Sequence, residues 1–171
     1  MINIITVKNK KQEKDFVLFP FELYKGCEYW VAPIIKEELE SMDKSKNPVF
    51  QNAEAEFYLA YKDNKVVGRI AAIVNWVEVE EQKKNKLRFG WYDTIDDVEV
   101  SKMLIEKVID FGKSRKLDFI DGPVGFSNMD KAGLLIHGYD ELNTMITWYH
   151  YPYQKNHLKK LGLDILAEWV E

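Results

Sequence analysis

The spacing of hydrophobic residues changes once in the middle of the chain, and this change limits the folds available to it. Apolar runs at residues 56–61, 66–74 and 87–92 predict strands, and residues 62–65 predict a hairpin turn between the first two. Beyond residue 96 the apolar positions recur at helical spacing: Val100, Leu104, Val108 and Phe111. An antiparallel meander therefore leads into a helix that buries one face.

The rest of the chain has the same two kinds of pattern. We expect further strands at residues 2–7, 117–120, 146–149 and 163–170, and helices at residues 11–25, 34–42 and 153–161. Pro20 lies inside the first helical segment and predicts two short helices or a kink there. This order indicates an α/β (α+β layered) domain, with a mixed, mostly antiparallel central sheet and helices on both faces.

Composition narrows the functional classes. A length of 171 residues predicts one domain, and a net charge of −4 argues against a nucleic-acid partner. No apolar run approaches the ~18 residues of a membrane span, and the first charges follow an apolar stretch, the reverse of a secretory signal. The single cysteine, Cys27, fits a reducing compartment. We therefore expect a cytoplasmic protein without a membrane partner.

Three segments carry a resemblance to a known superfamily. They are the hairpin EFYLAYKDNKVVGRIAAIV, the strand–helix unit LRFGWYDTIDDVEVSKMLIEKVIDFGKSRK and the ending HLKKLGLDILAEWV. Over residues 54–171 the chain resembles the GNAT N-acyltransferases. The segments NAEAEFYLAYKDNKVVGRIAAI and GPVGFSNMDKAGLLIHGYD look like one bacterial subgroup of GNAT-like proteins. The resemblance implies a transferase that uses acetyl-CoA or another acyl-CoA.

The resemblance also implies where a cofactor would lie. The superfamily holds acyl-CoA where its fourth and fifth strands splay apart, here residues 87–92 and 117–120. A bulge in the fourth strand exposes backbone groups to pantetheine, which assigns Gly90, Trp91 and Tyr92 to cofactor binding. The pyrophosphate rests on the N-terminus of the next helix, at Val98 and Glu99.

An acidic loop argues against that cofactor. In the superfamily, a glycine-rich loop with a Gln or Arg precedes this helix. Residues 93–99, in contrast, contain neither a glycine nor a basic residue. Four carboxylates stand there instead: Asp93, Asp96, Asp97 and Glu99. Their charge would repel phosphate, so we expect acetyl-CoA to bind weakly or not at all in the ordinary mode. The alternative is a helix N-terminus capped by its own acids, with Asp96 and Glu99 as a capping pair.

The resemblance supplies candidate catalytic residues. A tyrosine near the start of the last helix protonates the departing thiolate in GNAT enzymes, and Tyr153 or Tyr151 matches by position. Asp93, at the end of the fourth strand, is a candidate base for an amine, or else a solvated surface acid. The three histidines lack metal-ligand spacing, so we expect no metal site.

The segment 125–144 is long, contains glycines and follows a strand, so we expect it to roof a cleft for a small-molecule ligand. Its candidate binding residues, with an aromatic residue after it, are Asn128, Asp130, His137, Tyr139 and Trp148. The alternative is a flap that closes the core through residues 134–136.

Two functions follow. The first is an acyl-CoA-dependent N-acyltransferase, or a relative with an altered cofactor loop. The second is a non-catalytic GNAT-fold module for ligand binding or assembly. We expect residues 1–171 to form a single GNAT-like domain that lacks the usual last strand or belongs to a larger protein. The open sheet edge that a missing strand leaves predicts pairing with another chain, for example as a homodimer.

Overall fold

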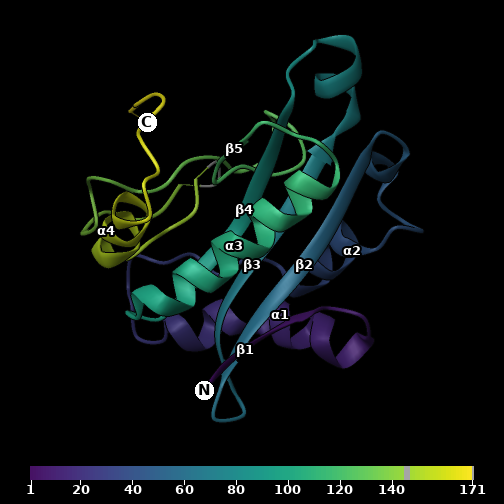
Figure 1. Cartoon of the computed structure of the whole chain (residues 1–171). Coiled ribbons are helices and arrows are strands. Elements are labelled where there is room, and N and C mark those ends of the chain that lie inside the picture. The colour runs from purple at the N-terminus through teal and green to yellow at the C-terminus, as the bar shows by residue number, and fades with distance from the viewer. Residues whose placement is uncertain (145–146, 171) are drawn as a thin grey trace.

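The computed structural model describes residues 1–144 and 147–170, and its centre is a five-stranded sheet (Figure 1). The strands cross the sheet in chain order: β1 (Ile2–Thr6), β2 (Ala53–Lys62), β3 (Lys65–Asn75), β4 (Lys86–Thr94) and β5 (Phe119–Asp121). Neighbours pair antiparallel except β4 and β5, which pair parallel. The predicted mixed, mostly antiparallel sheet is confirmed.

Helices cover both faces of this sheet, as predicted. On one face lie α1 (Lys10–Leu23) and α2 (Ile35–Met42), whose Phe16, Val17 and Met42 pack against alternate residues of β2 and β3. The other face is covered by α3 (Val98–Ser114), and α4 (Pro152–Lys160) lies beside α3 (Figure 1). Short helical turns, Pro48–Gln51 and Val77–Glu81, precede β2 and β4. The four residues of the predicted α3 stripe are all buried.

The first helix does not divide at Pro20, which was one of the two outcomes predicted there. It continues through Pro20 as a single helix instead of dividing into two. Proline has no N–H, so the carbonyl of Phe16 loses its helical donor. Arg69 replaces that donor, because its Nη1 donates to Phe16 O at 3.0 Å. A side chain from β3 thus stabilises the interruption in α1.

The predicted last strand is wrong. Residues 163–170 form no strand among the described residues, and most of their side chains are exposed. Gly162 ends α4 with φ +82°, and Trp169 then lies against the backbone of Gly133, where a Cβ would meet its ring at 2.7 Å. The predicted strand 146–149 begins outside the described residues, and residues 147–149 are irregular.

A β-bulge in β4 decides which helices its residues face. Ala71 pairs with Gly90 but Arg69 pairs with Asp93, so β4 has one more residue than β3 over this stretch. The backbone of Trp91 has φ +48° at the bulge. The side chain of Trp91 lies in the core beneath α1 and α2, whereas that of Tyr92 packs under α3. The alternation then places Asp93 on the α1 and α2 face.

Gly90 allows another segment to approach β4. A Cβ on Gly90 would lie 2.6 Å from the backbone oxygen of Val124. Another part of the backbone therefore lies directly against β4 at this glycine, and the bulge begins directly after Gly90. Strand β5 pairs with β4 only from Lys86 to Arg88, so the two strands are neighbours at one end, and residues 122–124 replace β5 further along.

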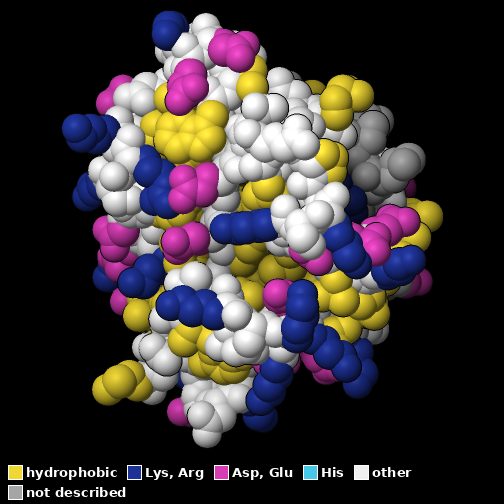
Figure 2. All heavy atoms as spheres, turned by 90° about the vertical axis from the view of Figure 1, so that its right-hand side faces the viewer, with side chains coloured by type: hydrophobic (Ala, Val, Ile, Leu, Met, Phe, Trp, Pro, Cys, Tyr) yellow, Lys and Arg dark blue, Asp and Glu magenta, His cyan; other side chains and the backbone are white. Residues whose placement is uncertain are grey.

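Charges of both signs are mixed on the side of the molecule seen in Figure 2, which lies to the right in Figure 1. Among the described residues, no helix combines the length and the apolar character needed to cross a membrane.

Candidate functional site

The bulge places the carboxylate of Asp93 beside a buried arginine. Arg69 Nε donates to Asp93 Oδ2 at 2.7 Å, and the two side chains are only 3% and 6% exposed. The guanidinium also lies 5.0 Å from the ring centroid of Phe16. A buried pair of this kind is stable only when its remaining hydrogen-bonding groups are satisfied. The free Phe16 carbonyl of α1 helps to meet this requirement.

A tyrosine at the end of α1 holds the other oxygen of Asp93. The hydroxyl of Tyr24 donates to Asp93 Oδ1 at 2.7 Å and lies 3.3 Å from Gln154 Oε1. Gln154 belongs to α4, and its Nε2 donates to Tyr92 O at 3.3 Å. Burial, followed by the charge of Asp93, raises the pKa of Tyr24 well above its usual range. Tyr24 is therefore a permanent donor that joins α1, β4 and α4.

A small cavity opens beside this cluster, with about 20 Å³ of free volume at its centre. Trp30, Trp148 and Tyr149 give it aromatic walls, and Pro20, Val31 and Pro33 give it aliphatic ones. Four charged side chains also line it: Glu38, Arg69, Asp93 and Lys131. The cavity thus combines apolar walls with a few polar groups, the usual composition of a small-molecule site.

Stacked tyrosines connect the cavity to α4. The ring of Tyr151 lies 5.1 Å from that of Tyr24 and 5.7 Å from that of Tyr153. Tyr151 is the N-cap residue of α4, as the resemblance implies, and Tyr153 lies in its first turn. The hydroxyl of Tyr153 donates to Thr94 O, the last residue of β4, at 2.7 Å. Burial is the main cause that raises the pKa of Tyr153, so its hydroxyl stays protonated at neutral pH.

Of the acidic residues predicted before α3, one lines the cavity and the others lie at the N-terminus of the helix. Asp93 is turned away into the cavity, so the expectation of four carboxylates at the helix N-terminus is corrected to three. Asp97, not Asp96, is the N-cap: its Oδ1 accepts from Glu99 N at 3.1 Å and its Oδ2 pairs with Lys62. Asp96 Oδ1 lies 3.1 Å from His157 Nε2. The predicted cofactor residues Val98 and Glu99 therefore stand at an N-terminus that the chain caps itself.

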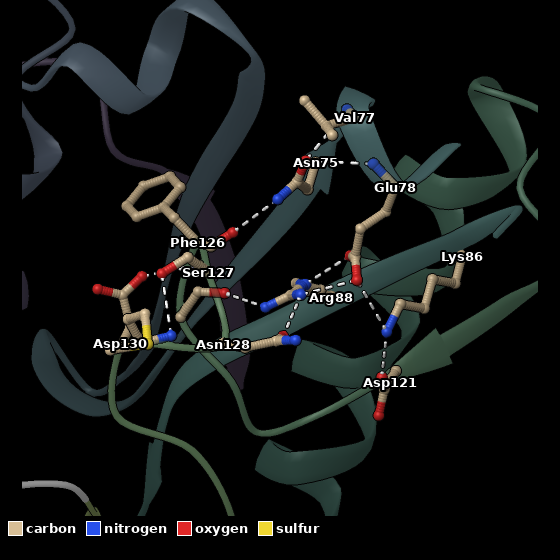
Figure 3. A network of polar contacts seen from close by, with 12 residues as sticks. Asn75, Val77, Glu78, Lys86, Arg88, Asp121, Phe126, Ser127, Asn128 and Asp130 are labelled. Atoms are coloured by element: carbon tan, nitrogen blue, oxygen red, sulfur yellow. Dashed lines mark hydrogen bonds and ion pairs between the residues drawn. The ribbon is translucent and has the colours of Figure 1, made fainter. Parts of the chain in front are cut away.

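Two predicted binding residues belong to a separate network around Arg88 (Figure 3). Arg88 donates to both oxygens of Glu78, at 2.7 and 2.8 Å, and to Asn128 Oδ1 at 2.6 Å. Lys86 bridges Glu78 and Asp121, and Asp130 Oδ2 accepts from Ser127 N at 2.7 Å (Figure 3). This network ties the 125–130 loop and the Val77–Glu81 turn to β4.

The predicted binding residues are thus dispersed. Trp148 and the candidate base Asp93 line the cavity together. His137 is exposed, and the hydroxyl of Tyr139 donates to the backbone of Leu135 at 3.0 Å. Trp91, predicted for the cofactor, contributes its indole N–H, which donates to Glu38 Oε2 at 2.7 Å.

Sequence reasoning missed several residues of the cavity: Tyr24, Trp30, Glu38 and Arg69. Only Arg69 had a clear signal, because it is the one charge within the apolar run of residues 66–74. A lone charge inside a buried strand predicts a buried partner. The described residues contain no group of three or more His, Cys, Asp or Glu side chains placed to hold a metal ion.

Two curated proteins are similar to the chain in sequence. No protein-family model matches the chain. It is 31% identical over 170 residues to Protein YghO of Escherichia coli, covering 97% of this chain and 43% of that protein. It is 28% identical over 141 residues to a bacterial ceramide synthase of Caulobacter vibrioides, covering 81% of this chain and 36% of that protein. The chain therefore spans less than half the length of these curated relatives.

Solved acetyltransferases share the fold. A predicted acetyltransferase of Clostridium acetobutylicum, solved with acetyl-CoA, superposes with a TM-score of 0.60 at 13% identity and covers all of this chain and 95% of its own. An aminoglycoside acetyltransferase from a soil metagenome, in complex with sisomicin, superposes with a TM-score of 0.50 at 13% identity. This match covers 72% of this chain and 78% of the acetyltransferase chain. The chain has the GNAT fold that its sequence resembles.

Proposed function

We propose that the chain is the GNAT-fold lobe of an acyl-CoA-dependent N-acyltransferase and that its acceptor amine enters the cavity beside Asp93. The supporting observation is the bulge in β4. It lies just beyond the point where β5 stops pairing with β4, the region in which the superfamily holds its thioester, and it also turns Asp93 into the cavity. The named relative supports the chemistry, since a ceramide is an amide of a long-chain amine.

The proposed step transfers the acyl group to nitrogen. The amine nitrogen attacks the thioester carbonyl, a C–N bond forms and the C–S bond breaks. Tyr153, or Tyr151 beside it, gives its proton to the departing thiolate, while the amine loses one proton. Asp93 is the candidate acceptor of that proton, but Tyr24 and Arg69 already occupy both its oxygens, so an amine must displace Tyr24 to reach it.

Release of free CoA thiol from acyl-CoA, with and without an added amine, tests the proposal. We expect amine-dependent release that falls about 100-fold in Tyr153→Phe, the lower range for loss of a general acid. Tyr61→Phe is the matched control, because its hydroxyl bonds Asp15 far from the cavity. Unchanged release in Tyr153→Phe assigns the acid to Tyr151, and amine-independent release in every variant refutes acyl transfer.

The second candidate is a ligand-binding or assembly module that does not hold CoA in the usual way. The self-capped N-terminus of α3 favours it, because Asp97 Oδ1 already accepts from Glu99 N, one of the N–H groups that a pyrophosphate would use. Calorimetry with acetyl-CoA decides: a micromolar dissociation constant contradicts this candidate. If the acids exclude phosphate, Asp96→Gly combined with Asp97→Gly binds acetyl-CoA more tightly than the unmodified chain.

A further inference from the structure

Two charged groups of the cavity lack a full partner among the residues that the structure describes. Lys131 lines the cavity and is partly buried, yet its Nζ has neither an ion pair nor a hydrogen bond with any described residue. Glu38 uses Oε2 to accept from the indole of Trp91, and its Oε1 has no partner in the described part of the chain. The two groups do not pair with each other, although Glu38 is the charge that acts most strongly on Lys131.

The other two charges of the cavity are already matched. Arg69 and Asp93 form a buried ion pair, and Tyr24 takes the remaining oxygen of Asp93. The cavity therefore offers one free ammonium and one free carboxylate oxygen, held apart on opposite elements, the 125–144 segment and α2. Neither atom is fully buried, so each keeps contact with solvent, and a ligand that brings the opposite charges would take the place of that water.

We propose that this cavity binds a small zwitterion with an ammonium and a carboxylate on the same carbon, as in an α-amino acid. The carboxylate contacts Lys131 and the ammonium contacts Glu38. The free volume of about 20 Å³ is smaller than this polar head, so binding requires the side chains around the cavity to move apart, and the apolar remainder extends along Pro33 to Val31, which is 45% exposed. The inference rests on the proposed function only in making this zwitterion the acyl acceptor.

Two further features agree with this assignment. Trp30 and Trp148 line the cavity, and aromatic faces attract an ammonium group. Burial lowers the pKa of the Lys131 amine. A bound carboxylate would reverse this shift, because an opposite charge favours the protonated form.

Binding of three matched ligands to the whole chain, without acyl-CoA, tests the inference. Norleucine carries both groups, pentylamine lacks the carboxylate and hexanoate lacks the amine. We expect norleucine to bind at least about 10-fold more tightly than either analogue, the range of one hydrogen bond to a charged group. Calorimetry or ligand-observed NMR at pH 7 measures this directly.

Substitutions then assign each charge. Lys131→Met should weaken norleucine and hexanoate about 10-fold and leave pentylamine unchanged, whereas Glu38→Gln should weaken norleucine and pentylamine and leave hexanoate unchanged. Lys131→Arg keeps the charge and should retain binding. Lys159→Met and Glu37→Gln, both exposed, are the matched controls. Thermal unfolding establishes that each variant is folded.

The outcomes separate the two proposals. Norleucine binding without acyl transfer supports the zwitterion site and contradicts the proposed function. Acyl transfer to pentylamine and norleucine alike, with Lys131→Met unchanged, supports the function and overturns the zwitterion site. The inference is also overturned if norleucine does not bind the folded chain at millimolar concentration.

Discussion

Arg69 performs several structural tasks at once. It neutralises Asp93, donates to the carbonyl that Pro20 leaves free and packs its guanidinium on the ring of Phe16. Each contact satisfies part of a charge that would otherwise be buried unpaired. Removing one partner of such a pair is costly because the other charge remains.

Arg69→Met should therefore lower the free energy of unfolding by about 3–5 kcal/mol, since Asp93 would stay buried without its cation. Urea denaturation measures this change. Lys10→Met, which breaks an exposed pair with Glu13, should leave stability nearly unchanged. Adding Asp93→Leu to Arg69→Met should restore part of the loss, and a further decrease would show that the charge is not the cause.

At the scale of elements, the bulge in β4 is the feature on which the site depends. It needs close approach of the 122–124 segment over Gly90, where Val124 N donates to Phe89 O at 2.7 Å. A side chain at this position would meet the Val124 carbonyl, which is backbone and cannot rotate away.

Gly90→Ala should destabilise the chain by about 1–3 kcal/mol, the usual cost of overpacking, because the Cβ displaces Val124 from β4. Gly112→Ala in α3 is the matched control. There the nearest atom is a leucine side chain at 3.2 Å, and alanine favours the helix. Chemical denaturation compares them, and equal losses would mean that Val124 is not held against β4.

The elements also show how far sequence reasoning reaches. Periodicity predicted α3 and the meander, because each is a local pattern of apolar positions. It could not predict the direction of Asp93, because one extra residue reverses the face of every residue after it. Tyr24 and Lys131 reach the cavity from segments far apart in the chain, so no local spacing brings them together. The strand expected at 163–170 failed because β-prone residues without a neighbouring strand form no ladder.

At the scale of the whole molecule, a buried histidine links stability to pH. His150 is 1% exposed, its Nδ1 accepts from Leu135 N at 3.3 Å, and burial lowers its pKa to about 4. The unfolded chain therefore binds a proton near pH 6.5, the usual histidine value, while the folded chain does so only near pH 4. Protonation favours unfolding across this window.

The free energy of unfolding should fall by about 2–3 kcal/mol from pH 7 to pH 4 on account of His150. His150→Asn, which keeps an acceptor for Leu135 N, should remove this part of the decline. Urea denaturation at several pH values in both proteins measures the difference. The same decline in both would assign the pH dependence to other groups.

The extra residue of β4 has a genetic consequence. An in-frame deletion of a single codon between residues 90 and 92 would straighten the strand and return its alternation to the ordinary phase. Asp93 would still lie opposite Arg69, because the pairs Ala71–Gly90 and Arg69–Asp93 would then be two residues apart on both strands. A lineage could therefore lose the bulge, and Trp91 with it, and keep the buried ion pair of the cavity.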